Sequence, residues 1–100
     1  MDFSSRLVAD PSIREMCRRY RVKELAVFGS ALREDFDVLS DVDLLVEFEP
    51  DVEVGFIAFS RLRRELSAHL HRPVDLVPKA GLKPRIRSSV LSDAKILYAA

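Results

Sequence analysis

The chain has 100 residues, of which 48% are hydrophobic and 32% are charged, and its formal net charge is zero. This balance suits one small folded domain and excludes a disordered chain. Zero net charge gives no general attraction to nucleic acid or to an anionic membrane. The one cysteine excludes an intrachain disulfide, and no apolar run is long enough to span a membrane. We therefore expect a cytoplasmic protein with no membrane partner.

The N-terminal part of the chain predicts one helix. Residues 1–9 show little pattern, and we expect this segment to be partly loose. Asp10 followed by Pro11 is typical of a helix start, because aspartate caps a helix and proline fits its first turn. A helix is therefore predicted from Pro11 to about Tyr20.

Two apolar runs in the next part predict strands. Residues 24–28 indicate a short buried strand, and residues 31–35 after it indicate a helical turn. Residues 41–48 indicate a second strand, along which successive side chains point to opposite faces. One face carries Asp41, Asp43, Leu45 and Glu47, and the other carries Val42, Leu44, Val46 and Phe48.

The second half predicts two helices around a third strand. In residues 55–70, apolar side chains recur at three- and four-residue spacing, which indicates an amphipathic helix. Residues 72–78 indicate a strand, residues 83–93 a last helix, and residues 95–99 a terminal strand or a frayed end. The core-facing stripe of the first helix consists of Phe56, Phe59, Leu62, Leu66 and Leu70.

This order of elements predicts the fold class. Helices and strands are interleaved along residues 1–100, and the strands are few and short. We expect a single α+β (or α/β) domain with a small mixed β-sheet flanked by helices.

Two carboxylates on one strand face raise a question of chemistry. Asp41 and Asp43 are two residues apart, so their side chains point the same way. Carboxylates held together away from bulk water repel each other, and a cation removes that penalty. Mg²⁺ prefers oxygen ligands and takes one or two protein carboxylates together with waters and phosphates. The pair is a candidate magnesium site, and the alternative is a pair that faces solvent at a strand start.

Two further motifs bear on the same site. Gly29-Ser30 follows a buried strand, where glycine admits a ligand close to the backbone and free N–H groups cradle phosphate; Gly-Ser is also a common turn. Asp75 lies in an apolar strand, where an isolated carboxylate is costly to bury. If that strand neighbours the strand of Asp41 and Asp43, three carboxylates converge. The alternative is an aspartate that faces solvent at a sheet edge.

Together these residues resemble the nucleotidyltransferase superfamily that includes DNA polymerase β. The shared pattern is Gly29-Ser30, ten residues, Asp41-Val42-Asp43, and a later strand with Asp75. The chain is more similar still to the minimal nucleotidyltransferases, the MNT-type antitoxins paired with HEPN-domain toxins. The similar segments are FGSALRE, SDVDLLVEF, RPVDLV and LKPRIR.

The resemblance covers about residues 13–98 and implies a polymerase β-like nucleotidyltransferase fold and a function. Asp41 and Asp43 would bind one or two Mg²⁺ ions that hold ATP, and Asp75 would join the second ion and activate the acceptor hydroxyl. The ions would stabilise charge on the attacking and leaving oxygens. AMP would pass to a tyrosine of a HEPN-type toxin and neutralise it. The residues implied to hold the β- and γ-phosphates are Gly29 and Ser30, with Arg33 assisting.

One departure from the family concerns charge. Glu34 stands where the family often has glycine, and Asp35 and Asp37 follow. Negative charge beside a triphosphate would weaken its binding unless these side chains point outward. The departure puts the efficiency of the site in doubt more than the fold.

Two other functions stay open. In the first, the chain is a non-catalytic binding module that neutralises a partner by occlusion alone. It would contact the partner through the helix of residues 56–70, the C-terminus, or the basic set Lys83, Arg85 and Arg87. The alternative for the basic set is a solvated helix face. Nucleotide addition to RNA is disfavoured by zero net charge and by the lack of accessory domains, so direct nucleic-acid binding is not expected. A domain this small would gain stability from a partner or from self-association, as a hetero- or homo-oligomer.

Overall fold

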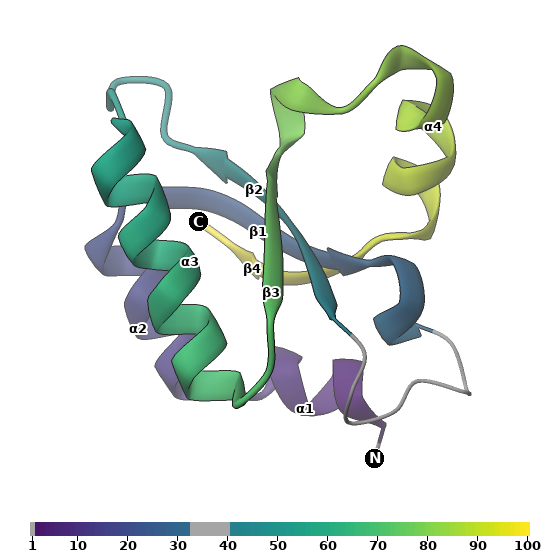
Figure 1. The fold of residues 1–100 in the computed structure, drawn as a ribbon, viewed down its shortest axis with the longest axis horizontal. Helices are drawn as coiled ribbons and strands as arrows, with labels where there is room; N and C mark the ends of the chain where they lie inside the picture. Colours follow the sequence, from purple (N-terminus) through teal and green to yellow (C-terminus); the bar gives the residue numbers. More distant parts are fainter. Residues whose placement is uncertain (1, 33–40) are drawn as a thin grey trace.

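The computed structural model of the chain describes residues 2–32 and 41–100 (Figure 1). Their strands form one four-stranded sheet with the order β3-β2-β1-β4. β1 pairs antiparallel with β2 and β4, whereas β2 pairs parallel with β3, so the predicted mixed sheet is confirmed. The strands are β1 (Val22–Phe28), β2 (Val42–Phe48), β3 (Val74–Pro78) and β4 (Lys95–Ala99).

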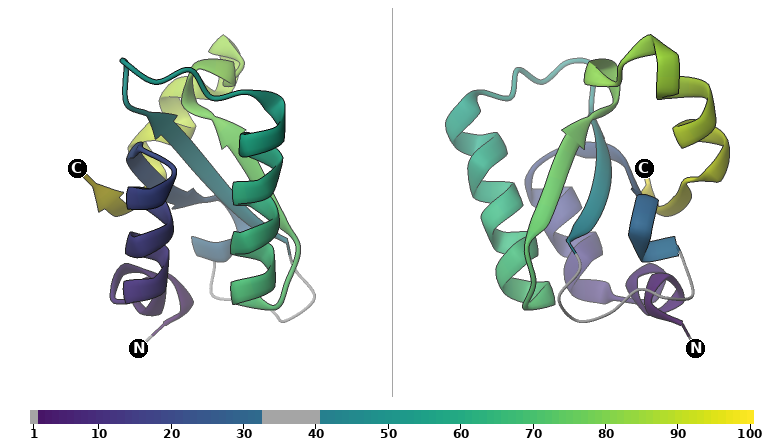
Figure 2. Two further views of the ribbon diagram at one scale, coloured as in Figure 1. Left: turned by 90° about the vertical axis from the view of Figure 1, so that its left-hand side faces the viewer. Right: turned by 45° about the vertical axis from the view of Figure 1, so that its right-hand side comes forward.

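Helices cover both faces of this sheet. Figure 2 shows α2 and α3 side by side on one face, and its right-hand view shows the sheet between α3 and α4. The helices are α1 (Phe3–Val8), α2 (Pro11–Arg19), α3 (Phe56–Leu70) and α4 (Pro84–Asp93), with the short 3₁₀ turns η1 (Gly29–Leu32) and η2 (Lys79–Gly81).

Aspartate caps begin the first two helices. Asp10 accepts a hydrogen bond from the Ser12 backbone N–H at 2.9 Å, and Pro11 is the first residue of α2, as predicted. Asp2 accepts from the Ser5 backbone N–H at 2.9 Å in the same way. That cap begins α1, in a segment where the sequence predicted no element.

The sheet separates a large core from a small one. On the side of α1, α2 and α3, apolar residues of all four strands pack against the helices. On the side of α4, Ala26, Leu45 and Leu82 form a smaller cluster. Val42, Leu44 and Val46 belong to the large core and Leu45 to the small one, which confirms the predicted alternation along residues 41–48.

The stripe of α3 is confirmed except at its first residue. Leu62 and Leu66 are buried and Phe59 and Leu70 pack partly against the large core, but Phe56 is 82% exposed. Six residues separate Phe56 from Leu62, which at 3.6 residues per turn places them about 120° apart around the helix. Phe56 therefore lies off the buried arc, and its prediction as a core residue was wrong.

β1 is longer than predicted, whereas β4 has the predicted extent. β1 begins at Val22, and a bulge between Val22 and Glu24 brings Val22 and Leu25 to the same core. Residues 95–99 form β4 as an edge strand paired with β1, so of the two alternatives for this segment the terminal strand is correct and the frayed end is not.

Among the helices that the structure describes, none is long and apolar enough to cross a membrane.

Candidate active site

The face of the sheet opposite α2 and α3 carries two of the predicted carboxylates side by side. Asp43 of β2 is the register partner of Asp75 of β3 in the parallel ladder. Neighbouring strands lie about 4.8 Å apart, and paired residues share a face. The strand adjacency on which a convergence of carboxylates depended is therefore present.

Asp43 and Asp75 differ in their exposure to solvent. Asp43 is half-buried, because β2 lies between β1 and β3, whereas Asp75 is exposed on the edge strand β3. The burial expected for Asp75 from its apolar neighbours is thus not found. Val74 and Leu76 are buried on the opposite face, whereas on the face of Asp75 the apolar Val77 is only partly buried, against the small cluster.

Asp41 lies one residue before β2 and is exposed. In residues 2–32 and 41–100, no three or more His, Cys, Asp or Glu side chains are grouped so that they could hold a metal ion. The structure therefore pairs Asp43 with Asp75 but does not gather all three aspartates into one preformed metal site. Asp41 stands outside the strand, so the pleat does not orient its side chain toward the other two.

Gly29 leaves the space that the Asp43 carboxylate occupies. Phe28 pairs with Asp43 across the antiparallel ladder, and Gly29 follows with φ +70°, a conformation that favours glycine. A Cβ atom at Gly29 would overlap Asp43 Oδ2 and lie 3.3 Å from its Cγ. Glycine is thus required here by the Asp43 carboxylate, in addition to any phosphate.

The remaining predicted nucleotide-binding residues follow Gly29 in the chain. The Ser30 backbone lies in η1. The side chain of Ser30 falls outside what the structure describes, as do all atoms of Arg33, Glu34, Asp35 and Asp37.

A charged cluster holds η2 to the same face of the sheet. Glu24 and Glu47 are paired across β1 and β2, where like charges destabilise a sheet. Lys79 Nζ lies 3.7 Å from Glu24 Oε1 and 3.6 Å from Glu47 Oε1, and so compensates both. The Arg87 guanidinium donates to the Lys79 carbonyl at 3.2 Å and thereby ties α4 to η2. Lys79 was not among the predicted site residues, although Glu24 and Glu47, one glutamate in each of two apolar strands, were a usable signal.

The basic set at the start of α4 is open to solvent. Lys83, Arg85 and Arg87 are all exposed, and within α4 no residue is fully buried. This finding suits both readings of the set, a solvated helix face and a contact surface.

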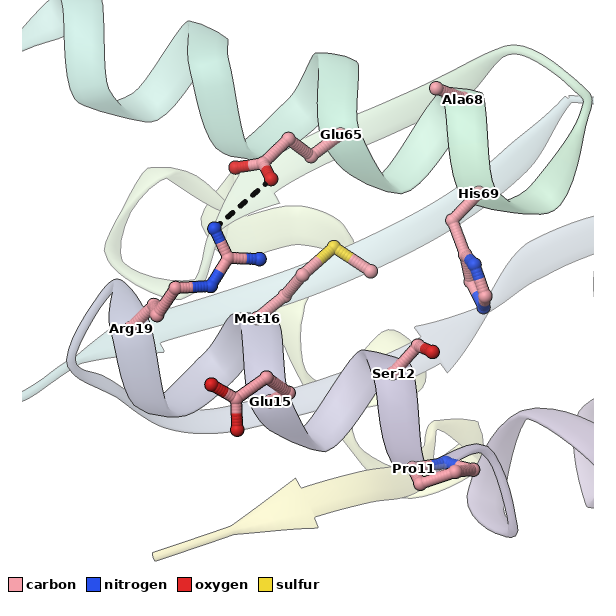
Figure 3. A pocket seen from close by; sticks show the side chains of 8 residues that line it. All are labelled: Pro11, Ser12, Glu15, Met16, Arg19, Glu65, Ala68 and His69. Atoms are coloured by element: carbon pink, nitrogen blue, oxygen red, sulfur yellow. Dashed lines mark hydrogen bonds and ion pairs between the residues drawn. The ribbon is translucent and has the colours of Figure 1, made fainter.

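A groove of about 480 Å³ lies on the other side of the sheet, between α2 and α3 (Figure 3). Arg19 and Glu65 form an ion pair at 3.2 Å across it, and the Tyr20 hydroxyl donates to Glu65, which lowers the pKa of that carboxyl. His69 lies 2.7 Å from Asp10 at its far end. The groove is separated from Asp43 by the sheet, and its charged groups join the two helices.

Cys17 is excluded as a nucleophile. It is 1% exposed in the large core, and burial raises the pKa of its thiol to about 12. A thiol in this state is protonated at neutral pH and unreactive.

Most of the chain matches a known family. Residues 12–97 match the model of the nucleotidyltransferase domain. The chain belongs to the nucleotidyltransferase domain family. A solved structure ascribed to a minimal nucleotidyltransferase covers 95% of this chain with 95% of its own length, at 34% identity and a TM-score of 0.76.

Two more relatives extend this comparison. Protein adenylyltransferase MntA of Thermococcus cleftensis is 41% identical over 81 residues, which are 80% of this chain and 79% of MntA. A structure of a tri-AMPylated Shewanella oneidensis HEPN toxin in complex with its MNT antitoxin covers 98% of this chain and 74% of that chain, with a TM-score of 0.68. At 20% identity, the latter likeness concerns the nucleotidyltransferase fold alone.

Proposed function

We propose that this nucleotidyltransferase moves AMP from ATP onto a partner protein, a HEPN-type toxin, and so neutralises it in the cytoplasm. The observation that carries the proposal is the placement of Asp43, which lies against Gly29 and in register with Asp75. The relationship to a protein adenylyltransferase and the shared fold with an MNT antitoxin support the choice of reaction and partner.

Mg²⁺ is the metal that suits the acids present. Asp43 and Asp75 offer carboxylate oxygens, and Asp41 lies two residues before Asp43 in the chain. Mg²⁺ is commonly bound by one or two carboxylates together with substrate phosphates and waters, so a preformed site of three side chains is not required. When bound, one or two Mg²⁺ ions would stabilise the charge that develops on the oxygens around the α-phosphate.

Different residues would bind the nucleotide and accept the proton during the transfer. The acceptor hydroxyl oxygen forms a bond to the α-phosphorus, the bond from that phosphorus to the bridging oxygen breaks, and pyrophosphate leaves. The hydroxyl proton passes to Asp75, which is exposed at the sheet edge and can be reached from another molecule. Gly29, Ser30 and Arg33 would hold the β- and γ-phosphates.

Transfer to a toxin gives a physical route to its neutralisation. An adenylyl group adds bulk and negative charge to the acceptor side chain. Close to a site that binds RNA, both effects oppose the approach of the phosphate backbone.

The experiment is an intact-mass measurement of both chains after incubation of the protein with Mg²⁺, ATP and its co-purifying or genetically adjacent partner. We expect the partner to gain the mass of one or more adenylyl groups with the native chain and none with the Asp41→Ala/Asp43→Ala variant. An Arg18→Ala variant, which changes an exposed residue of α2 on the other side of the sheet, serves as the control and should retain transfer. No mass gain with the native chain would contradict the transferase.

Neutralisation by occlusion is the second candidate. Phe56 and Ile57 are 82% and 70% exposed, which favours a binding surface independent of the aspartates. Under occlusion, the complex forms and the partner stays inactive in the Asp41→Ala/Asp43→Ala variant. Under the transferase, the complex still forms but the partner remains active.

A further inference from the structure

The start of α3 presents an apolar surface to solvent. Phe56 and Ile57, adjacent in the chain, are 82% and 70% exposed, whereas the other exposed large hydrophobic residues in the described part of the chain range from 36% to 53%. Single exposed apolar side chains are ordinary, but two bulky neighbours exposed to this degree indicate a contact surface.

Charge is ordered on the two sides of this surface. Asp51 and Glu53 precede it and are exposed, and Arg61 and Arg64 follow it and are exposed. Ile57, Arg61 and Arg64 are spaced by four and seven residues, so they share the face of α3 that points away from the core. The acidic residues precede Gly55, the N-cap of α3, so the order along the chain from the N-terminal end of this helix is acidic, apolar, basic.

Such an order is complementary to itself. A two-fold axis crossing α3 between Ile57 and Arg61 would run the helix antiparallel to a copy. The Arg64 position lies about 10 Å beyond Ile57 along the helix. The acidic segment leads into the opposite, N-terminal end of α3. The rotation therefore brings each acidic segment to the arginines of the other copy, and a contact of this kind occurs twice.

The pattern also distinguishes among occupants. A partner surface of one sign would be attracted by one end of the face and repelled by the other. Asp51 already pairs with Arg21 at 3.3 Å, but both side chains are more than half exposed, and such a pair holds its members weakly.

We infer that the outer face of α3 binds a second copy of this chain. Ile57 lies near the two-fold axis, and Asp51 and Glu53 of each copy face Arg61 and Arg64 of the other. Because α3 covers the face of the sheet opposite Asp43 and Asp75, the dimer leaves both active sites open (Figure 2).

Charge reversal tests the arrangement directly. One variant carries Asp51→Arg and Glu53→Arg, and the other carries Arg61→Glu and Arg64→Glu. Analytical ultracentrifugation should show a concentration-dependent dimer for the native chain, which weakens in high salt, and a monomer for each variant alone. An equimolar mixture of the two variants should dimerise again, because both contacts then pair opposite charges.

An apolar substitution with a matched control completes the test. Ile57→Glu should raise the dimer dissociation constant at least about tenfold. Ile96→Glu, which changes an exposed isoleucine of β4, should leave it unchanged. A native chain that is monomeric at the highest concentration reached, or a variant mixture that stays monomeric, would overturn the inference. A monomeric native chain whose α3 variants lose binding to the toxin would assign this face to the toxin instead.

Discussion

The two faces of the sheet share their strands but differ in what covers them. On one face, residues from β1, β2, β3 and β4 pack against α1, α2 and α3 in a large apolar core. The other face has only a small apolar cluster beneath α4 and carries the carboxylates of Glu24, Asp43, Glu47 and Asp75.

This difference shows how a short chain separates stability from chemistry. Because side chains alternate along a strand, β2 places Leu44 in the core and Asp43 on the open face. The face covered by α1, α2 and α3, here called the closed face, supplies the apolar burial that stabilises the sheet. The other face, here called the open face, can then carry carboxylates whose mutual repulsion lowers stability. Such locally unfavourable arrangements are expected at functional sites.

The largest effect on stability should separate two adjacent leucines. Leu44 is 0% exposed in the large core, and Leu45 is 3% exposed in the small cluster beneath α4. We expect Leu44→Ala to lower the free energy of unfolding by about 4 kcal/mol and Leu45→Ala by about 2 kcal/mol, because the thinner layer over Leu45 can collapse more easily. Urea denaturation measures both. Equal losses would contradict the contrast between the two faces.

Gly29→Ala should disturb the open face specifically. The substitution places a Cβ against Asp43 Oδ2 at a backbone φ of +70°, so we expect a loss of about 1–3 kcal/mol in unfolding free energy. The displaced carboxylate should also reduce AMP transfer. Gly81→Ala is the control, since its Cβ would lie 3.8 Å from the nearest atom of Pro78. If Gly29→Ala leaves both stability and transfer at native values, the contact between Gly29 and Asp43 is not required.

Asp10→Asn should weaken the closed face in a pH-dependent way. Burial works to raise the pKa of Asp10, but hydrogen bonds with His69 and the Ser12 N–H hold it below its ordinary value. Asparagine retains the helix cap and loses the charge, so we expect a loss of about 1 kcal/mol at pH 7.

The pH profile identifies the cause of that loss. Because the folded pKa of Asp10 is lowered, its contribution is fully present above the unfolded value of 3.8 and disappears as the pH falls through the folded value. The difference between the native chain and Asp10→Asn, followed by urea denaturation, should therefore shrink below about pH 4. A difference that is constant down to pH 2 would show that the charge of Asp10 is not the cause of the loss.

The smallest effect on stability should come from a substitution of Lys79, which links α4 to the sheet through η2. Lys79 joins Glu24 and Glu47 and supplies the carbonyl that binds Arg87. We expect Lys79→Met to change global stability by less than about 1 kcal/mol. Hydrogen exchange of α4 amides should nevertheless become faster than in a Lys83→Met control. Unchanged exchange in α4 would show that the small apolar cluster alone holds this helix.

Local pattern predicted most elements but not their neighbours in space. The Asp10 cap, the alternation along β2 and the stripe of α3 are properties of adjacent residues, and the sequence displays them directly. Phe56 departs from the stripe because three-residue steps rotate away from the buried arc. The extent of β1 depends on a bulge, which no short-range signal announced.

The candidate site depends on pairing between distant segments. The acids were recognised by their spacing, but the adjacency of Asp43 and Asp75 follows from the order of strands in the sheet. Likewise, the contact between Gly29 and Asp43 follows from the register of β1 with β2. The ion pairs of Lys79 arise because its side chain, at the start of η2, reaches Glu47 of β2 and Glu24 of β1. Burial of Asp75 was expected from its neighbours, yet an edge strand leaves it exposed.

One substitution tests the separation of stability and chemistry most directly. AMP transfer and the free energy of unfolding should be measured on the same preparation of Asp43→Asn. We predict that transfer falls by roughly a hundredfold or more. The free energy of unfolding should change far less than in Leu44→Ala, because asparagine keeps the size of the side chain and residue 43 lies outside the large core. Retained transfer, or a loss of stability as large as that of Leu44→Ala, would contradict the separation.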